Sequence, residues 1–350
     1  MSNAQSVSRV AVASVIAILA LPVAATSSNQ GHGDVAITRA ALLRLDAEVA
    51  RERATSTPTL RADVQSKRLR VQSGDLLSAT SVRNRVLQLK ADSTRLIGAK
   101  LKGHSFTPRG VDYDEVSGLL AIAAVGQVLL YTPATGDVVV IAADFDFAND
   151  VVFDNDGGLI IADQGTETNA LMPRDGVLWR YDLATAEITS IATSRPLSNP
   201  KLVALDRKGV VHFIDGGAGD LVSPVFDVRW DVLYRVEGKK LNRVKVVWDD
   251  AGIQATAYDI DRAGWHWMMN LGELVRIKGA KFVQPCLPPY PLLFATGLAI
   301  DDDGDAMVLD GADVLTKARA IYDIDSSCQV SLRTAKKLRG SRGLAVVDEP

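Results

Sequence analysis

The sequence predicts an all-β fold, a six-bladed β-propeller with four-stranded blades. Three observations support this prediction. A motif recurs five times along the chain, most copies are followed by a second pair of strands, and the two chain ends supply complementary parts of a sixth copy. The chain has 350 residues, 47% of them hydrophobic and 23% charged, which is ordinary for a globular protein. Large all-β folds reach this length as one unit.

The recurring motif predicts a β-hairpin. Each copy has a short apolar run, an Asp, a turn that ends in Gly, and a second apolar run that ends in most copies on an acid or amide. Apolar runs rich in Val, Ile and Leu predict strands, and Asp with Gly predicts a tight turn between them. The copies are RGVDYDEVSGLLAIAA from Arg109, NDVVFDNDGGLIIAD from Asn149, KLVALDRKGVVHFID from Lys201, TAYDIDRAGWHWMMN from Thr256 and TGLAIDDDGDAMVLD from Thr296.

Most copies continue with a second strand pair, as in GQVLLYTPATGDVVVI, GVLWRYDLATAEITSI, DVLYRVEGKKLNRVKVV and GELVRIKGAKFVQ. Four strands per unit, repeated every 40 to 55 residues or so, are typical of a propeller. The C-terminal RGLAVVDEP from Arg342 predicts a first strand without a second. GDLLSAT from Gly74, NRVLQLKA from Asn84 and STRLIGAKLKG from Ser93 predict second, third and fourth strands. Together these pieces complete a sixth blade and remove the open edges, with seven blades as the alternative.

The repeats resemble the superfamily that includes SMP-30/gluconolactonase proteins, strictosidine-synthase-like proteins and NHL repeats. The resemblance covers the chain from about Gly74 to the end. It rests on NDVVFDNDGGLIIAD, which is similar to a blade start that carries a metal-binding Asn in calcium-dependent lactonases and phosphotriesterases, and on GVLWRYDLATAEIT. It implies Asn149 as a metal ligand, calcium as a candidate cofactor and lactone or ester hydrolysis as a candidate activity. One fold hosts many activities, so the resemblance is specific for fold only.

Candidate site residues follow from the alignment of the repeats. First strands of a propeller start near the central axis on one face, and second strands end on that face. The predicted first-strand starts are Arg109, Asn149, Lys201, Thr256, Thr296 and Arg342, and the predicted second-strand ends are Thr80, Ala124, Asp163, Asp215, Asn270 and Asp310. Three long connections, QGTETNALMPRDG, GGAGDLVSPVFDVRWD and GADVLTKARA, are predicted to border the same face.

The first functional hypothesis is a hydrolase whose calcium site is altered or lost. Calcium takes six to eight oxygen ligands, which Asn149 could supply together with Asp150, Asp215 and Asp310. The resemblance implies a Glu in the first blade, where this chain has Arg109. Lys201 and Arg342 add two more cations, and three positive charges around a divalent ion cost several kcal/mol.

Two other hypotheses stay open. A metal-free binding module would use Arg109, Lys201 and Arg342 for an anionic small molecule, a peptide carboxylate or a protein partner, together with Asn149, Asp150 and Asp310. Those cations could equally pair with Asp163, Asp215 and Asp310. A metal-free enzyme would need a general acid or base, for which Asp163, Asp215 and Glu273 are the candidates.

Several conspicuous features predict structure rather than chemistry. DNDGG at Asp154 and DDDGD at Asp301 lack the rest of a calcium loop and predict hairpin turns. His212 and His266 lie inside predicted strands and are expected to pack near the core. Trp265 and Trp267 should share one strand face and pack within a blade. A pI of about 5.9 without a basic stripe excludes nucleic acid as an expected partner.

The N-terminus predicts export. Arg9 precedes an apolar run from Val10 to Ala25 that is too short to span a bilayer and ends in small residues. Residues 1–25 are therefore predicted as a cleaved signal peptide, 26–70 as a flexible polar leader and 71–350 as the propeller. The mature chain is expected in the periplasm or outside the cell, without a membrane span. A disulfide between Cys286 and Cys328 and two free thiols are both compatible with the sequence.

Overall fold

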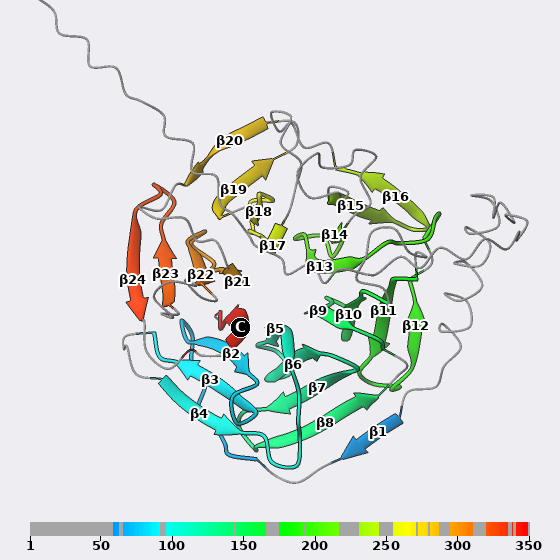
Figure 1. Ribbon diagram of the computed structural model, residues 1–350, viewed down its shortest axis with the longest axis vertical. Helices are drawn as coiled ribbons and strands as arrows, with labels where there is room; N and C mark the ends of the chain where they lie inside the picture. Colours follow the sequence, from blue (N-terminus) through cyan, green and yellow to red (C-terminus); the bar gives the residue numbers. More distant parts are fainter. Residues whose placement is uncertain are drawn as a thin grey trace, which may run out of the picture. The chain divides into compact units, whose positions relative to one another are not determined.

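A computed structural model describes most of the predicted propeller (Figure 1). The described residues are 59–62, 66–91, 96–142, 145–165, 175–191, 193–216, 231–244, 255–270, 272–278, 281–286, 295–310, 320–334, 338 and 341–348. All of them belong to one compact unit, Thr38–Pro350. The predicted signal peptide, most of the leader and most of the three long connections lie outside them. No helix among these residues is long and apolar enough to cross a membrane.

The described strands form six sheets, as predicted. Blade 1 contains β5 (Pro108–Asp114), β6 (Leu119–Ala124), β7 (Gln127–Thr132) and β8 (Asp137–Ala142); blade 2 contains β9 (Ala148–Phe153), β10 (Gly158–Asp163), β11 (Val177–Asp182) and β12 (Ile188–Ser190); blade 3 contains β13 (Pro200–Leu205), β14 (Val211–Asp215), β15 (Val232–Glu237) and β16 (Lys240–Arg243). Blade 4 contains β17 (Ala255–Ile260), β18 (His266–Asn270), β19 (Glu273–Lys278) and β20 (Lys281–Cys286); blade 5 contains β21 (Ala295–Ile300), β22 (Ala306–Asp310), β23 (Ala320–Ile324) and β24 (Val330–Thr334).

The sixth blade joins the two ends of the propeller sequence, which confirms the predicted closure. Its order is β25 (Ser341–Val346), β2 (Leu76–Thr80), β3 (Arg85–Leu89) and β4 (Leu96–Lys100). The pairs Leu76↔Val346 and Thr80↔Ser341 bound the antiparallel ladder between β25 and β2. The ring therefore closes through a strand pairing between residues more than 260 positions apart in the chain.

Blade 1 has a fifth strand, β1 (Thr59–Ala62), which lies within the stretch predicted as a leader. It pairs antiparallel with β8, with Thr59 opposite Ala142 and Ala62 opposite Val139. The chain after β1 stays on this blade, because the Ser66 amide donates to the Gly136 carbonyl over 2.5 Å. The outer edge of β8, which is rich in Val, is therefore covered by a strand of the same chain.

The predicted hairpin turns have the predicted chemistry. Asp154 Oδ1 accepts hydrogen bonds from the amides of Asp156 and Gly158 at 2.9 and 2.6 Å, and Asp206 Oδ1 accepts from the amides of Lys208 and Val210 at 2.8 and 3.0 Å. The DNDGG and DDDGD segments are turns, as expected. The turn glycines adopt positive φ, the conformation in which glycine costs least. They are Gly118, Gly157, Gly209, Gly264 and Gly304.

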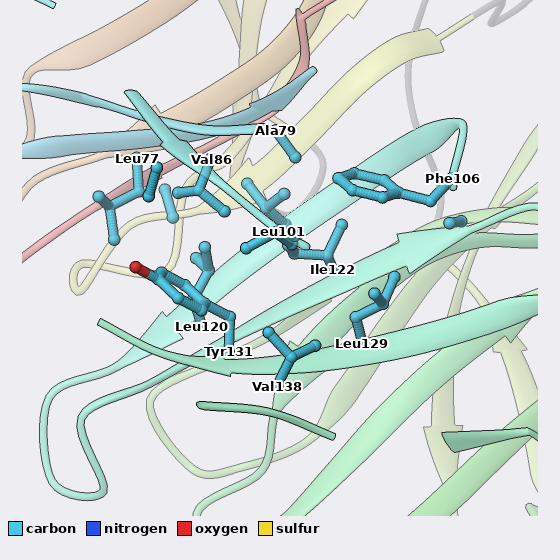
Figure 2. Close-up of a cluster of buried hydrophobic side chains, with 14 of the residues drawn as sticks. Leu77, Ala79, Val86, Leu101, Phe106, Leu120, Ile122, Leu129, Tyr131 and Val138 are labelled. Atoms are coloured by element: carbon cyan, nitrogen blue, oxygen red, sulfur yellow. The ribbon is translucent and has the colours of Figure 1, made fainter. Parts of the chain in front are cut away.

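Buried apolar side chains fill the seams between neighbouring blades. Figure 2 shows the seam between blades 6 and 1, where Leu77 and Val86 of blade 6 pack with Leu120, Ile122 and Tyr131 of blade 1. The described residues form one such cluster at each of the six seams. Trp267 is 1% exposed in the seam between blades 4 and 5, and Trp265 packs against the same cluster, which confirms their expected packing role.

Candidate functional site in the central channel

The innermost strands of the six blades surround a cavity of about 340 Å³. Every one of β5, β9, β13, β17, β21 and β25 contributes side chains to its wall. All six predicted first-strand starts line it, namely Arg109, Asn149, Lys201, Thr256, Thr296 and Arg342. We call these six residues the donor ring, because each of their side chains can donate a hydrogen bond and none carries a negative charge.

A recurrent β-bulge explains why four of these side chains, in blades 2 to 5, face the channel. In blade 2, Ala148 pairs with Asp163 and Asp150 pairs with Ala162, so that Asn149 has no partner on β10. Lys201, Thr256 and Thr296 are skipped in the same way in blades 3 to 5. A bulge leaves its extra residue unpaired and redirects its side chain, which is why bulges are common beside functional sites.

Arg109 and Arg342 lie on adjacent inner strands that approach unusually closely. Gly343 has φ +67°, and a Cβ at this position would lie 2.6 Å from the Val111 amide nitrogen and 2.9 Å from the Gly110 carbonyl carbon. Only glycine fits this backbone contact between β25 and β5. The contact brings the two arginines together at the wall, and the positive charge of Arg342 acts on Arg109.

The cations of the donor ring have different surroundings. Lys201 Nζ lies 2.6 Å from Asp231 Oδ2, so this ammonium group is neutralised locally. The Arg109 guanidinium stacks on Phe147, 4.3 Å from the ring centroid. Burial, followed by the charge of Arg342, lowers the pKa of Arg109 to about 10. Within the described residues neither arginine makes an ion pair.

Three carboxyl groups line the same cavity, and we call Asp112, Asp150 and Asp259 the acid tier. Each accepts a hydrogen bond from a backbone amide of the next blade. Asp112 Oδ2 accepts from Phe153 over 2.7 Å, Asp150 Oδ2 from Val203 over 3.0 Å, and Asp259 Oδ2 from Ile300 over 3.1 Å. These bonds satisfy amides on the exposed edges of inner strands and tie neighbouring blades together.

The acid tier holds its protons more tightly than ordinary aspartates. Burial raises the pKa of Asp112 to about 8 and the pKa values of Asp150 and Asp259 to about 7. The charge of Asp259 raises the pKa of Asp112 and of Asp150 further, whereas the backbone hydrogen bonds act in the opposite direction. Near neutral pH the tier therefore carries less than its full negative charge.

The predicted second-strand ends do not belong to the cavity wall. Asp163 is fully buried, and its Oδ1 accepts from the Phe147 amide at 2.9 Å while the indole of Trp179 donates to Oδ2 at 3.3 Å. Asp215 accepts from the amides of Ser198 and Asn199, the latter at 2.6 Å.

Asp163 and Asp215 thus fix the segments that precede the inner strands of their own blades. This placement favours a structural role, and no observation tests the catalytic role predicted for them. Asp310 is buried and Glu273 is exposed on β19, and neither lines the cavity. Of the residues predicted to bind a ligand, Arg109, Asn149, Asp150, Lys201 and Arg342 share the cavity wall.

The described residues do not fit a calcium ion. Asn149 and Asp150 line the cavity, but both Asp150 oxygens accept backbone hydrogen bonds, from Val151 and Val203. Asp215 and Asp310, the other predicted ligands, lie outside the wall, and the donor ring contributes three cations. No group of three or more His, Cys, Asp or Glu among the described residues could hold a metal ion.

Sequence reasoning missed Asp112 and Asp259. They occupy equivalent places on β5 and β17, where the other inner strands carry Val152, Ala204, Ala299 and Ala345. The sequence signal for both residues was an Asp at a strand position that is apolar in the other four inner strands.

Comparisons with known proteins show the fold but not the activity. No family model and no curated protein matches the chain. Among solved structures, a protein of unknown function from Bacteroides caccae matches with a TM-score of 0.57 at 14% identity, over 79% of this chain and 100% of that one. A virginiamycin B lyase from Staphylococcus aureus matches with a TM-score of 0.53 at 10% identity, over 79% and 88%.

A gluconolactonase from Xanthomonas campestris matches with a TM-score of 0.49 at 14% identity, over 79% of this chain and 88% of that one. Sequence identities this low are evidence for a shared fold alone. The resemblance predicted from the sequence is therefore confirmed for the fold: the chain has six propeller blades and shares its fold with the virginiamycin B lyase and the Bacteroides caccae protein.

Proposed function

We propose that the protein binds a small anionic molecule in its central channel. The observation that supports this proposal is the donor ring, six side chains with hydrogen-bond donors, on six different strands, that line one cavity. Arginine binds carboxylate, sulfate and phosphate groups through paired N–H donors, and Asn and Thr complete such sites with neutral donors. A cavity of about 340 Å³ suits a small molecule or the end of a larger one.

Thermal unfolding of the full chain with a panel of carboxylates, sulfonates and phosphates tests the proposal. A ligand present at a hundred times its dissociation constant raises the free energy of unfolding by about 2.7 kcal/mol. We expect at least one anion to raise the melting temperature, and Arg109→Gln to abolish the rise. Calcium and EDTA should leave the melting temperature unchanged, because the cavity residues do not fit the ion. No response to any anion would refute the proposal.

A second candidate is a metal-free hydrolase of lactones or esters. The acid tier favours it, because carboxyl groups with pKa values of about 7 and 8 can exchange protons near neutral pH. Asp150 is the candidate general base, since it lies next to Asn149 of the donor ring and lines the cavity. Hydrolysis of neutral lactones should then increase between pH 6 and 8, and Asp150→Asn should abolish it while retaining the fold. A screen without turnover would leave the binding proposal as the only one.

We also propose that the protein is exported to the periplasm or the outside of the cell. Cys328 is disulfide-bonded, and the only other cysteine is Cys286. Disulfides persist in oxidising compartments, which supports the export predicted from residues 1–25. Mass spectrometry of the protein from the expressing cell should find a mature N-terminus at Thr26. A chain that begins at Met1 or Ser2 in the cytosolic fraction would contradict it.

A further inference from the structure

The donor ring contains a surplus of two positive charges. Of its three cations, Lys201 is paired with Asp231. Arg109 and Arg342 make no ion pair within the described part of the chain, and the Nε atom of Arg109 is buried there without a hydrogen-bond partner. Two guanidinium groups therefore face one small cavity without a counter-charge from the ring.

The acid tier does not neutralise this surplus. The carboxylates of Asp112, Asp150 and Asp259 accept hydrogen bonds from backbone amides of neighbouring blades, and in the described part of the chain none of them forms an ion pair with either arginine. The charge that most affects Arg109 is that of Arg342, which is repulsive. Like charges held side by side in a cavity destabilise the protein unless a ligand compensates them.

The two arginines are held in place rather than brought together by chance. The Gly343 backbone contact with Gly110 fixes β25 against β5, and Phe147 supports one face of the Arg109 guanidinium. Asn149 lies on the next strand, beside Arg109, and its amide can donate to the same ligand. A preorganised pair of guanidinium groups with a neutral donor beside it matches a compact oxyanion with several oxygens.

We infer that the channel ligand carries a compact dianionic oxyanion, of the kind found in phosphate monoesters, held between Arg109 and Arg342. This inference rests on the proposed binding of an anion in the channel and adds the charge and shape of the group. A doubly charged group neutralises both arginines, whereas a single carboxylate leaves one of them uncompensated.

Isothermal titration calorimetry of the full chain with two matched probes tests the inference. Phenyl phosphate is mostly a dianion at pH 7, where the acid tier is not fully ionised, because the second pKa of phosphomonoesters is about 6. Benzenesulfonate has the same ring and a similar tetrahedral head but one charge. We expect phenyl phosphate to bind at least tenfold more tightly. Equal affinities would overturn the dianion inference and leave anion binding standing, and absence of binding by both probes would overturn the two together.

Single substitutions test whether Arg342 causes the preference for the dianion. Arg342→Gln should reduce the affinity for phenyl phosphate more than that for benzenesulfonate and bring the ratio close to one. Arg342→Lys keeps the charge and should keep part of the ratio, so it separates loss of charge from loss of fold. Lys240→Gln on the exposed strand β16 removes a cation far from the donor ring and should leave the ratio unchanged. A ratio that persists in Arg342→Gln at an unchanged melting temperature would refute the assignment.

Discussion

The imidazole rings of His212 and His266 lie 4.8 Å apart, centroid to centroid, across the seam between blades 3 and 4. Both side chains are buried, as expected from their places in strands, and the seam around them is apolar. His266 Nδ1 lies 2.7 Å from the hydroxyl of Tyr258, a residue of the channel wall, and His212 Nε2 lies 3.4 Å from Asp206 Oδ2. A proton on either ring therefore adds a charge to an apolar seam beside the other ring.

This pair predicts acid sensitivity. Burial, followed by the charge of His212, lowers the pKa of His266 to about 4, and burial also lowers the pKa of His212. In the unfolded chain each ring titrates near 6.5, so the unfolded state binds more protons below that pH. The stabilisation that the two neutral histidines contribute to the folded state is complete above pH 6.5 and is lost as the pH falls towards 4. For His266 the difference corresponds to about 3 kcal/mol.

The measurement is the change in melting temperature between pH 7 and pH 5. His212→Phe keeps a ring in the seam and should show a smaller decrease on acidification than the wild type. Asp206→Asn removes the anion beside His212 and should show a larger one. Arg235 and Asp261 also act on the pair and stay in place in both variants. A decrease in His212→Phe as large as that of the wild type would contradict the role of the pair.

Gly343→Ala should be strongly destabilising. The substitution places a Cβ 2.6 Å from the Val111 nitrogen, and that backbone atom cannot move without separating β25 from β5. Gly264→Ala is the matched control, because Gly264 has φ +79° but nothing within 4 Å of a Cβ. Positive φ alone costs about 1–2 kcal/mol for alanine. We expect about that loss for Gly264→Ala and at least 1 kcal/mol more for Gly343→Ala in urea unfolding. Equal losses would show that the strand contact is unimportant.

The propeller could be predicted from the sequence because its signals are local and repeated. The apolar runs, the Asp–Gly turns and the incomplete blades at both ends each depend on neighbouring residues. The donor ring was also predictable, because Arg109, Asn149 and Lys201 occupy the same place in successive repeats.

The rest of the site depends on side-chain direction and on contacts between blades. The alignment of the repeats predicted that Asp163 and Asp215 lie at the channel face of the propeller. It could not predict whether their side chains point into the channel or towards the backbone of their own blades. Asp112 and Asp259 have no acidic counterpart in the other repeats at their position, and the partner amides of Phe153 and Ile300 lie about 40 residues away. The contact of His212 with His266 joins two blades and has no local sequence signal.

Asp112→Asn should become stabilising as the pH rises. Burial raises the pKa of Asp112 from 3.8 to about 8, so the folded protein holds a proton that the unfolded chain has released. The free energy of unfolding contributed by this group therefore decreases as the pH rises from about 4 to 8. Below about pH 4 the variant should match the wild type, because Asn can accept the Phe153 amide as the protonated acid does, and its advantage should grow from there towards pH 8.

Between pH 6 and pH 9 the advantage of Asp112→Asn over the wild type in the free energy of unfolding should grow by about 1–3 kcal/mol, measured by urea unfolding at both pH values. The control is Asp137→Asn, at an exposed position on β8, which should show no growing advantage. A constant difference between Asp112→Asn and the wild type from pH 6 to 9 would show that the carboxyl group stays charged throughout.

Removal of β25 should unfold the whole ring. Truncation after Gly340 deletes the strand that pairs with β2, together with Leu344 and Val347, which are 4% and 5% exposed. Each buried side chain of this size contributes about 1.5–3 kcal/mol, and the total stability of a domain is about 5–15 kcal/mol. The truncation also leaves the inner edge of β2 without its strand partner. We therefore expect loss of the cooperative thermal transition, whereas deletion of residues 1–37, outside the compact unit, should preserve it. A truncated chain that melts cooperatively near the wild-type temperature would show that the ring does not depend on its closing strand.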